Sequence, residues 1–302
     1  MSHENWSARD RAPADTEDGL REALEDDAAR TRREAALALV DRAEAGLDDA
    51  TVAALSERVR GDDDPDVRQF AVEALGVAGA GTEAVGAALD DPEPWVRAEA
   101  VVALSRADGD PDRLREALGD DSGWVRRNAV IALGKLDAAD QDLLVDRIKS
   151  DPHPAVREYA AQFLGRDPED GEEAERILAA LLAREANAFV RAKAAEGLGQ
   201  IGTDRAEEAL ETHGLTDRSE DVARTARHAL ADARGVDPER LDAEVDPPTA
   251  PGSGPDTPGD QAVEGFRPDP SDPSGWSEES AAPGGAPGFD PQRDLDADMT
   301  DR

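Results

Sequence analysis

The sequence predicts an all-α fold, an α-solenoid of about seven two-helix repeats with a disordered acidic C-terminal tail. Three observations lead to this prediction: a Val-Arg pair recurs at nearly regular intervals, the same apolar positions follow each pair, and the composition changes after about Val236. We expect a flexible N-terminus over residues 1–15, a repeat region over residues 16–235 and a disordered tail over residues 236–302.

The repeat is anchored on one dipeptide, whose copies begin 29 to 36 residues apart. That interval is the length of two antiparallel helices with short loops, which is the period of a solenoid. The last copy has Ala in place of Arg, as expected for a terminal capping repeat. The seven copies are Thr31-Arg32, Val67-Arg68, Val96-Arg97, Val125-Arg126, Val156-Arg157, Val190-Arg191 and Val222-Ala223.

The second helix of each unit is predicted from the residues that follow the anchor. Counted from the first residue of the dipeptide, position 4 is Ala and position 8 is Leu in all seven units. These positions share one stripe of an α-helix, where small Ala residues allow close packing. Four units have a good N-cap residue before this helix: Asp64, Ser122, Asn187 and Ser219. Four have a Gly after the Leu that is expected to end the helix as a C′ residue: Gly76, Gly134, Gly165 and Gly199.

A first helix is expected upstream of each second helix, and six such segments are recognised, over residues 51–59, 82–89, 112–118, 141–148, 172–182 and 205–211. The composition changes after the repeat region. Residues 236–302 hold 12 of the 20 prolines, with 17 acidic and four basic residues. Such a segment cannot bury enough apolar surface to offset the entropy of ordering it, so disorder is expected there.

An acidic residue stands six positions before the anchor arginine position in all seven units. An acid in the turn and an Arg in the first helical turn can form a charge-assisted hydrogen bond, either within the unit or to the next one. Repeated along a stack, such pairs would fix the register of neighbouring units. The acidic residues are Asp26, Asp62, Asp91, Asp120, Asp151, Glu185 and Asp217.

This combination of acid, Val-Arg, Ala and Leu-Gly resembles the HEAT-repeat family, most closely its short, Ala-rich PBS lyase HEAT-like type. The resemblance covers roughly residues 17 to 235. It implies an α-solenoid in which the Asp and Arg of the motif are structural ladder residues. Carried over to this sequence, the ladder comprises Asp62, Arg68, Asp91, Arg97, Asp120, Arg126, Asp151, Arg157, Glu185 and Arg191.

The formal net charge of −36 argues against binding to nucleic acid or to an anionic membrane, because both need a basic surface. The chain has 31 arginines but only three lysines, Lys135, Lys149 and Lys193. An acidic, lysine-poor composition resembles that of halophilic archaeal proteins, although an acidity that serves a cationic partner is the alternative. The polar N-terminus and the lack of a long apolar run favour a cytoplasmic protein. We also expect a monomer.

The residue types present give little support to the hypothesis of an enzyme. The chain has no cysteine, and its only His-Glu dipeptide is His3-Glu4 in the polar N-terminus. The iron site of a HEAT-like deoxyhypusine hydroxylase, which uses several His-Glu pairs, is therefore not expected, and we predict no metal, no cofactor and no catalytic residue. An enzyme or enzyme accessory subunit, bilin-lyase-like or oxidoreductase-like, remains the alternative that the family resemblance leaves open.

The favoured interpretation is a non-catalytic scaffold that binds a peptide or protein along the concave face formed by the second helices. There the residues that point away from the core stripe are less charged than the chain average and include several apolar side chains. Trp95 and Trp124 occupy equivalent positions in adjacent units and would lie roughly 10 Å apart. The candidate partner-binding residues are Trp95, Trp124, Arg127, Asn128, Tyr159 and Lys193.

Overall fold

A computed structural model describes residues 16–106, 109–166, 168–238 and 241, which belong to one compact unit, and in these ranges it contains fourteen α-helices and no strand. Odd-numbered helices are the first helices of the units: α1 (Glu17–Ala23), α3 (Asp49–Gly61), α5 (Thr82–Ala87), α7 (Pro111–Glu116), α9 (Gln141–Ser150), α11 (Gly171–Arg184) and α13 (Asp204–Ala209). Even-numbered helices are the second helices: α2 (Ala29–Ala43), α4 (Pro65–Val77), α6 (Pro94–Arg106), α8 (Gly123–Lys135), α10 (Pro154–Arg166), α12 (Ala188–Ile201) and α14 (Glu220–Arg234).

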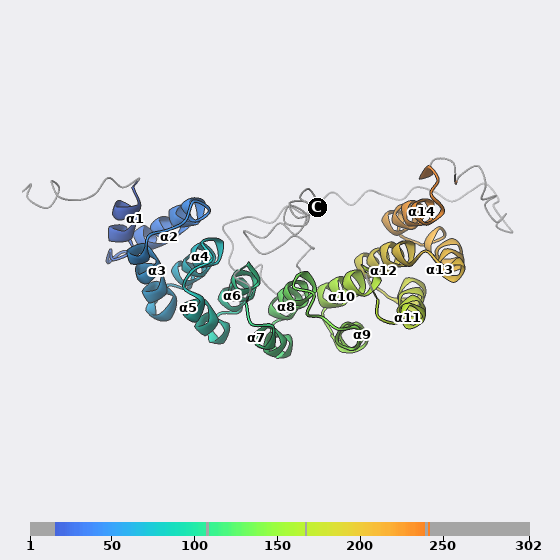
Figure 1. Ribbon diagram of the computed structural model, residues 1–302, viewed down its shortest axis with the longest axis horizontal. Coiled ribbons are helices and arrows are strands. Elements are labelled where there is room, and N and C mark those ends of the chain that lie inside the picture. The colour runs from blue at the N-terminus through green and yellow to red at the C-terminus, as the bar shows by residue number, and fades with distance from the viewer. Residues whose placement is uncertain (1–15, 107–108, 167, 239–240, 242–302) are drawn as a thin grey trace, which may run out of the picture. The chain divides into compact units, whose positions relative to one another are not determined.

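The two sets of helices form two layers within this unit (Figure 1). Each second helix packs against the second helices before and after it, and the first helices lie on the outer side of the curve that the second helices line. This confirms the predicted stack of about seven helix pairs. The predicted flexible N-terminus, and the predicted tail from residue 242 onward, lie outside the described residues.

The core follows the predicted stripe. The Ala at position 4 and the Leu at position 8 of every unit are at most 3% exposed, and so are the six anchor valines. Leu residues therefore fill the space between helices, while Ala residues keep neighbouring second helices close. The first helices add Leu55, Leu114 and Leu178 to the core, and the turn after α13 adds Leu210, each fully buried.

The predicted helix starts are correct, since Asp64, Ser122, Asn187 and Ser219 are the N-cap residues of α4, α8, α12 and α14. Three of the first-helix segments are more tightly or more loosely wound at their C-terminal ends than expected. Residues 88–90 and 117–119 form 3-10 turns, and residues 210–214 form a π-helical turn. Helix α1 lies upstream of the first segment listed from the sequence, and Thr16 caps it by accepting a hydrogen bond from the Gly19 N–H.

The interpretation of Gly76, Gly134, Gly165 and Gly199 as C′ residues was wrong. All four lie inside α4, α8, α10 and α12, which continue past them. Glycine is needed at these positions because the neighbouring helix passes too close for a side chain. A Cβ on Gly165 would lie 2.3 Å from the Cα of Gly197 on α12. The other three would meet the next second helix at 2.4 to 2.7 Å. Positive φ angles typical of a helix end occur instead at Gly46, Gly79, Gly202 and Gly235.

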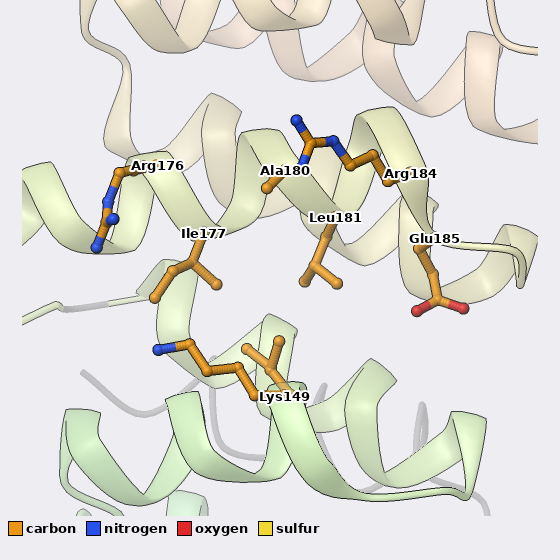
Figure 2. A pocket seen from close by; sticks show the side chains of 8 residues that line it. Lys149, Arg176, Ile177, Ala180, Leu181, Arg184 and Glu185 are labelled. Atoms are coloured by element: carbon orange, nitrogen blue, oxygen red, sulfur yellow. The ribbon is translucent and has the colours of Figure 1, made fainter.

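A shallow pocket of about 410 Å³ opens between α9 and α11 in the outer layer (Figure 2). Its apolar floor comes from Ile148, Ile177 and Leu181. No local sequence pattern predicts this pocket, because it depends on how two first helices from different units approach one another.

Candidate functional site

The Arg of one unit pairs with the acid of the following unit at every step of the stack. In six successive pairs the guanidinium donates two hydrogen bonds, from Nε and Nη2, to the two carboxylate oxygens at 2.7 to 3.2 Å. The pairs are Arg32 with Asp62, Arg68 with Asp91, Arg97 with Asp120, Arg126 with Asp151, Arg157 with Glu185, and Arg191 with Asp217. We refer to these twelve residues as the ladder.

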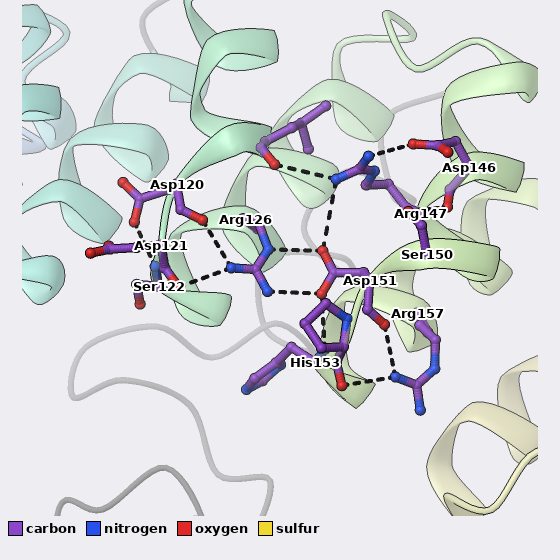
Figure 3. A network of polar contacts seen from close by, with 12 residues as sticks. Asp120, Asp121, Ser122, Arg126, Asp146, Arg147, Ser150, Asp151, His153 and Arg157 are labelled. Atoms are coloured by element: carbon purple, nitrogen blue, oxygen red, sulfur yellow. Dashed lines mark hydrogen bonds and ion pairs between the residues drawn. The ribbon is translucent and has the colours of Figure 1, made fainter.

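Each ladder arginine also binds its own unit. Figure 3 shows Arg126 donating from Nη1 to the backbone carbonyls of Asp120 and Asp121 while its other nitrogens hold the Asp151 carboxylate. The same Nη1 contact to the backbone six residues earlier occurs at 2.9 to 3.0 Å for all six arginines. Because a planar guanidinium serves both units at once, it fixes the register between them.

The ladder carboxylates complete the arrangement by accepting a backbone N–H two residues further along, as His153 donates to Asp151 at 2.9 Å. Burial alone would raise the pKa of the Asp151 carboxyl, but the hydrogen bonds from Arg126 and from the His153 N–H outweigh it and lower the pKa. The same balance lowers the pKa of Asp62, Asp120 and Glu185. These acids therefore stay ionised in the fold, where they have structural partners on every side.

The inner face offers a different kind of cluster, centred on Arg127 of α8. Its guanidinium carbon lies 5.5 Å from the centroid of the Trp124 ring and 5.1 Å from that of Tyr159 on α10. Its Nη2 donates to the Tyr159 hydroxyl at 3.4 Å. Trp124 in turn lies edge-on to the His153 imidazole, with ring centroids 5.1 Å apart. Cation–π contacts at these distances orient both aromatic rings about one fixed cation.

Two buried polar side chains lie on α8 and on the preceding second helix, α6. Asn128 is 5% exposed, and its Nδ2 donates to the Ala98 carbonyl of α6 at 3.1 Å. Its Oδ1 has no hydrogen-bond partner within the described ranges. Glu99 on α6 is 8% exposed, and burial, reinforced by the charge of Glu73, raises the pKa of its carboxyl to about 8.

The pKa of the Glu158 carboxyl on α10, near the cluster, is also raised. Burial raises the pKa of its carboxyl, while the positive charges of Lys193 and Arg127 oppose the shift. These two cations therefore face the same stretch of α10. Lys193 also forms an ion pair with Glu196 on its own helix, with Nζ 2.9 Å from Oε2.

The structure thus brings three of the six candidate residues, Trp124, Arg127 and Tyr159, into one contacting group. Arg127 is only 4% exposed and Asn128 is buried beside it, so both lie beneath the surface. Trp95 lies at the start of α6 and is 42% exposed. Among the described residues, the ring contact of Trp124 is with His153, and no ring contact joins it to Trp95.

Sequence reasoning did not include Glu158 and His153 among the candidate residues of this site. In a chain with 70 acidic residues, a single Glu at an inner helical position carries no signal of its own. Its burial depends on the neighbouring units. His153 precedes Pro154 at the start of α10, where its contact with Trp124 depends on how α8 and α10 pack.

Two features are absent from the described residues. No group of three or more His, Cys, Asp and Glu side chains is placed to hold a metal ion there. No described helix is both long and apolar enough to cross a bilayer.

The stacked helix pairs and their repeated Arg–acid contacts define an α-solenoid of short repeats. Residues 82–148 and 141–231 match the family model of HEAT repeats. The repeat region therefore belongs to the HEAT-repeat family. No curated protein matches the sequence.

One solved structure shares this fold, and two others resemble the chain less closely. The Escherichia coli protein YibA is 20% identical over 73% of this chain and 82% of its own, with a TM-score of 0.54. The complex of CpcE and CpcF of phycocyanin lyase from Nostoc sp. PCC7120 is 20% identical over 81% of this chain and 97% of that chain, with a TM-score of 0.46. Human deoxyhypusine hydroxylase is 26% identical over 72% and 84%, with a TM-score of 0.35.

Proposed function

We propose that the protein is a non-catalytic scaffold that binds a peptide or protein partner along the inner face of its second helices. The observation that carries the proposal is the Trp124, Arg127 and Tyr159 cluster, in which one guanidinium holds two aromatic rings in place. Rigid aromatic side chains provide contact area at low entropic cost, which is why Trp and Tyr dominate binding hot spots.

The six candidate residues take two roles in this proposal. Trp95, Trp124, Tyr159 and Lys193 are at least partly exposed and would contact the partner directly. Arg127 and Asn128 are buried and would act as positioning residues, the first by fixing both rings and the second by joining α8 to α6.

Affinity capture from native lysate at high salt, followed by mass spectrometry, tests the proposal. A variant combining Trp95→Ala with Trp124→Ala, and a separate Tyr159→Ala variant, should lose the partners that the unaltered protein retains. Glu57→Ala is the control, because Glu57 is exposed on α3, a first helix of the outer layer that lies away from the inner face. If circular dichroism shows intact helices in the aromatic variants and their captured partners are unchanged, the proposed site is wrong.

Two further outcomes separate this proposal from its alternatives. Loss of capture on deleting residues 236–302, with the aromatic variants still active, would assign binding to the acidic tail. A coloured or metal-containing preparation would favour an enzyme or enzyme accessory subunit, including one of the PBS lyase HEAT-like type that the repeat pattern resembles.

We also propose that the scaffold acts as a monomer in the cytoplasm of a halophile. The net charge of −36 and the excess of arginine over lysine support the halophilic origin in this proposal. Molar salt reduces the Debye length to about 3 Å, so short-range contacts rather than long-range attraction would select the partner. Sedimentation in about 2 M KCl tests the monomer, since a dimeric mass would contradict it.

A further inference from the structure

The outer layer carries a second surface that the inner-face function does not use. The pocket between α9 and α11 has Ile148, Ile177 and Leu181 as its floor and three cationic side chains around it. Figure 2 shows Ile177 and Leu181 pointing from α11 toward the helix that carries Lys149. Ile148 and Ile177 are buried, whereas Lys149, Arg176 and Arg184 are exposed.

The charge of this pocket is opposite to that of the chain as a whole. Acidic residues outnumber basic ones by 70 to 34, yet Lys149 and Arg184 form no ion pair with any described residue. Arg176 has only an exposed contact with Glu173, at 3.3 Å. The one carboxylate in the lining, Glu185, is already held by Arg157 and by the Asn187 N–H. The pocket therefore presents positive charge over an apolar floor.

We infer that the α9/α11 pocket binds an acidic segment of a partner protein that carries one large apolar side chain flanked by carboxylates. The apolar side chain would cover Ile177 and Leu181, and the carboxylates would accept hydrogen bonds from Lys149 and Arg184. Charge complementarity selects this occupant, because two cations without a described acidic partner favour a negatively charged ligand and the floor favours an apolar one. A volume of about 410 Å³ falls within the range of small binding pockets.

Fluorescence anisotropy with a defined probe tests the inference on the full chain. The probe is a fluorescein-labelled nonapeptide with a central Trp and two Glu residues on each side. We expect Lys149→Gln combined with Arg184→Gln to weaken binding at least about tenfold, because two charge-assisted contacts are lost. Ala180→Glu, which places a carboxylate in the pocket on an exposed helical position, should abolish binding without disturbing the core.

A matched control separates the pocket from the net charge. Arg166→Gln combined with Arg224→Gln removes the same two charges from exposed positions on α10 and α14, and should leave the affinity within about twofold of the unaltered protein. Probes with Ala for Trp, or with Gln for all four Glu, should bind weakly, and raising KCl from about 0.1 M to about 1 M should weaken the original probe.

Three results would overturn the inference: no binding by the unaltered chain, equal losses in the pocket and control variants, or unchanged binding when the probe lacks its Trp. Tyr159→Ala serves as a cross-check. It should leave probe binding unchanged, so a failure at this pocket is distinguishable from a failure of the proposed inner-face function.

Discussion

At the scale of single residues, acidic side chains differ in their contribution to stability. Those of the ladder are buried and paired, whereas others are exposed to solvent. Asp151 is fully buried and accepts both hydrogen bonds of the Arg126 fork, whereas Asp121 is 91% exposed although it also contacts a ladder arginine, Arg97. A buried pair fixes geometry, and removing one member leaves a desolvated charge behind. Exposed pairs contribute little because water and salt screen them.

Asp151→Asn should therefore destabilise the protein by about 3 kcal/mol, because the Arg126 guanidinium loses its buried countercharge. Asp121→Asn is the matched control and should change stability little. Equilibrium unfolding in denaturant, followed by circular dichroism, measures both variants. Equal midpoints for Asp151→Asn and the unaltered protein would contradict the structural role of the ladder.

The effect of Asp151→Asn should also depend on pH. The pKa of Asp151 is lower in the fold than its ordinary value of about 4, so its stabilising contribution is present above that pH and is lost as pH falls through the lowered pKa. The stability difference between the unaltered protein and Asp151→Asn should be full at neutral pH and shrink below about pH 4. A difference that stays constant into acid would indicate loss of packing rather than loss of charge.

Glu99 should show the opposite pH dependence. Burial raises the pKa of its carboxyl to about 8, so the contribution of its neutral form is fully present below the ordinary pKa and is lost as pH rises through about 8. Glu99→Gln cannot ionise, and each unit of pKa difference is worth about 1.4 kcal/mol. Thermal unfolding from about pH 5 to about pH 9 should show this variant gaining stability relative to the unaltered protein. Parallel pH profiles would show that Glu99 is not desolvated in the fold.

At the scale of helices, close contacts between second helices account for the small residues of the repeat. Gly165 and Gly197 bring α10 and α12 into backbone contact, which no residue with a Cβ could allow without displacement. Gly61 on α3 contrasts with them, because a Cβ there would have nothing within 4 Å. Gly165 thus lies at a close contact between two helices, whereas Gly61 lies beside open space.

Gly165→Ala should destabilise the protein by about 1 to 3 kcal/mol, since the added methyl meets backbone that cannot rotate away. Gly61→Ala should instead be neutral or stabilising by up to about 1 kcal/mol, as expected for Gly replaced by a better helix former. Thermal or denaturant unfolding compares the pair. If both substitutions stabilise alike, α10 and α12 do not approach as closely as the structure shows.

The helices also show which features local sequence could predict. Ala and Leu at fixed positions define the buried stripe because helical periodicity alone places them on one face. The glycines were misassigned because a Gly near a helix end has the same local pattern whether it terminates the helix or admits a neighbour. Trp124 was recognised as a candidate, but its contacts with His153 and, through Arg127, with Tyr159 depend on packing between units. The α9/α11 pocket likewise has no local pattern.

At the scale of the whole molecule, contacts between neighbouring units stabilise the fold, and the net charge of −36 opposes it. Self-repulsion of that charge opposes compaction, and salt screens it, whereas the buried ladder pairs are screened much less. The melting temperature should therefore rise as KCl increases from about 0.1 M to about 2 M, which differential scanning calorimetry can measure. A melting temperature that falls over this range would mean that salt-sensitive attraction dominates.

The most direct measurement of the central claim is hydrogen exchange of the protein with and without its captured partner. A partner bound on the inner face should slow exchange in α8 and α10, at and around Trp124 and Tyr159, and should leave α9 and α11 unchanged. Protection confined to the outer helices, or to residues 236–302, would contradict it.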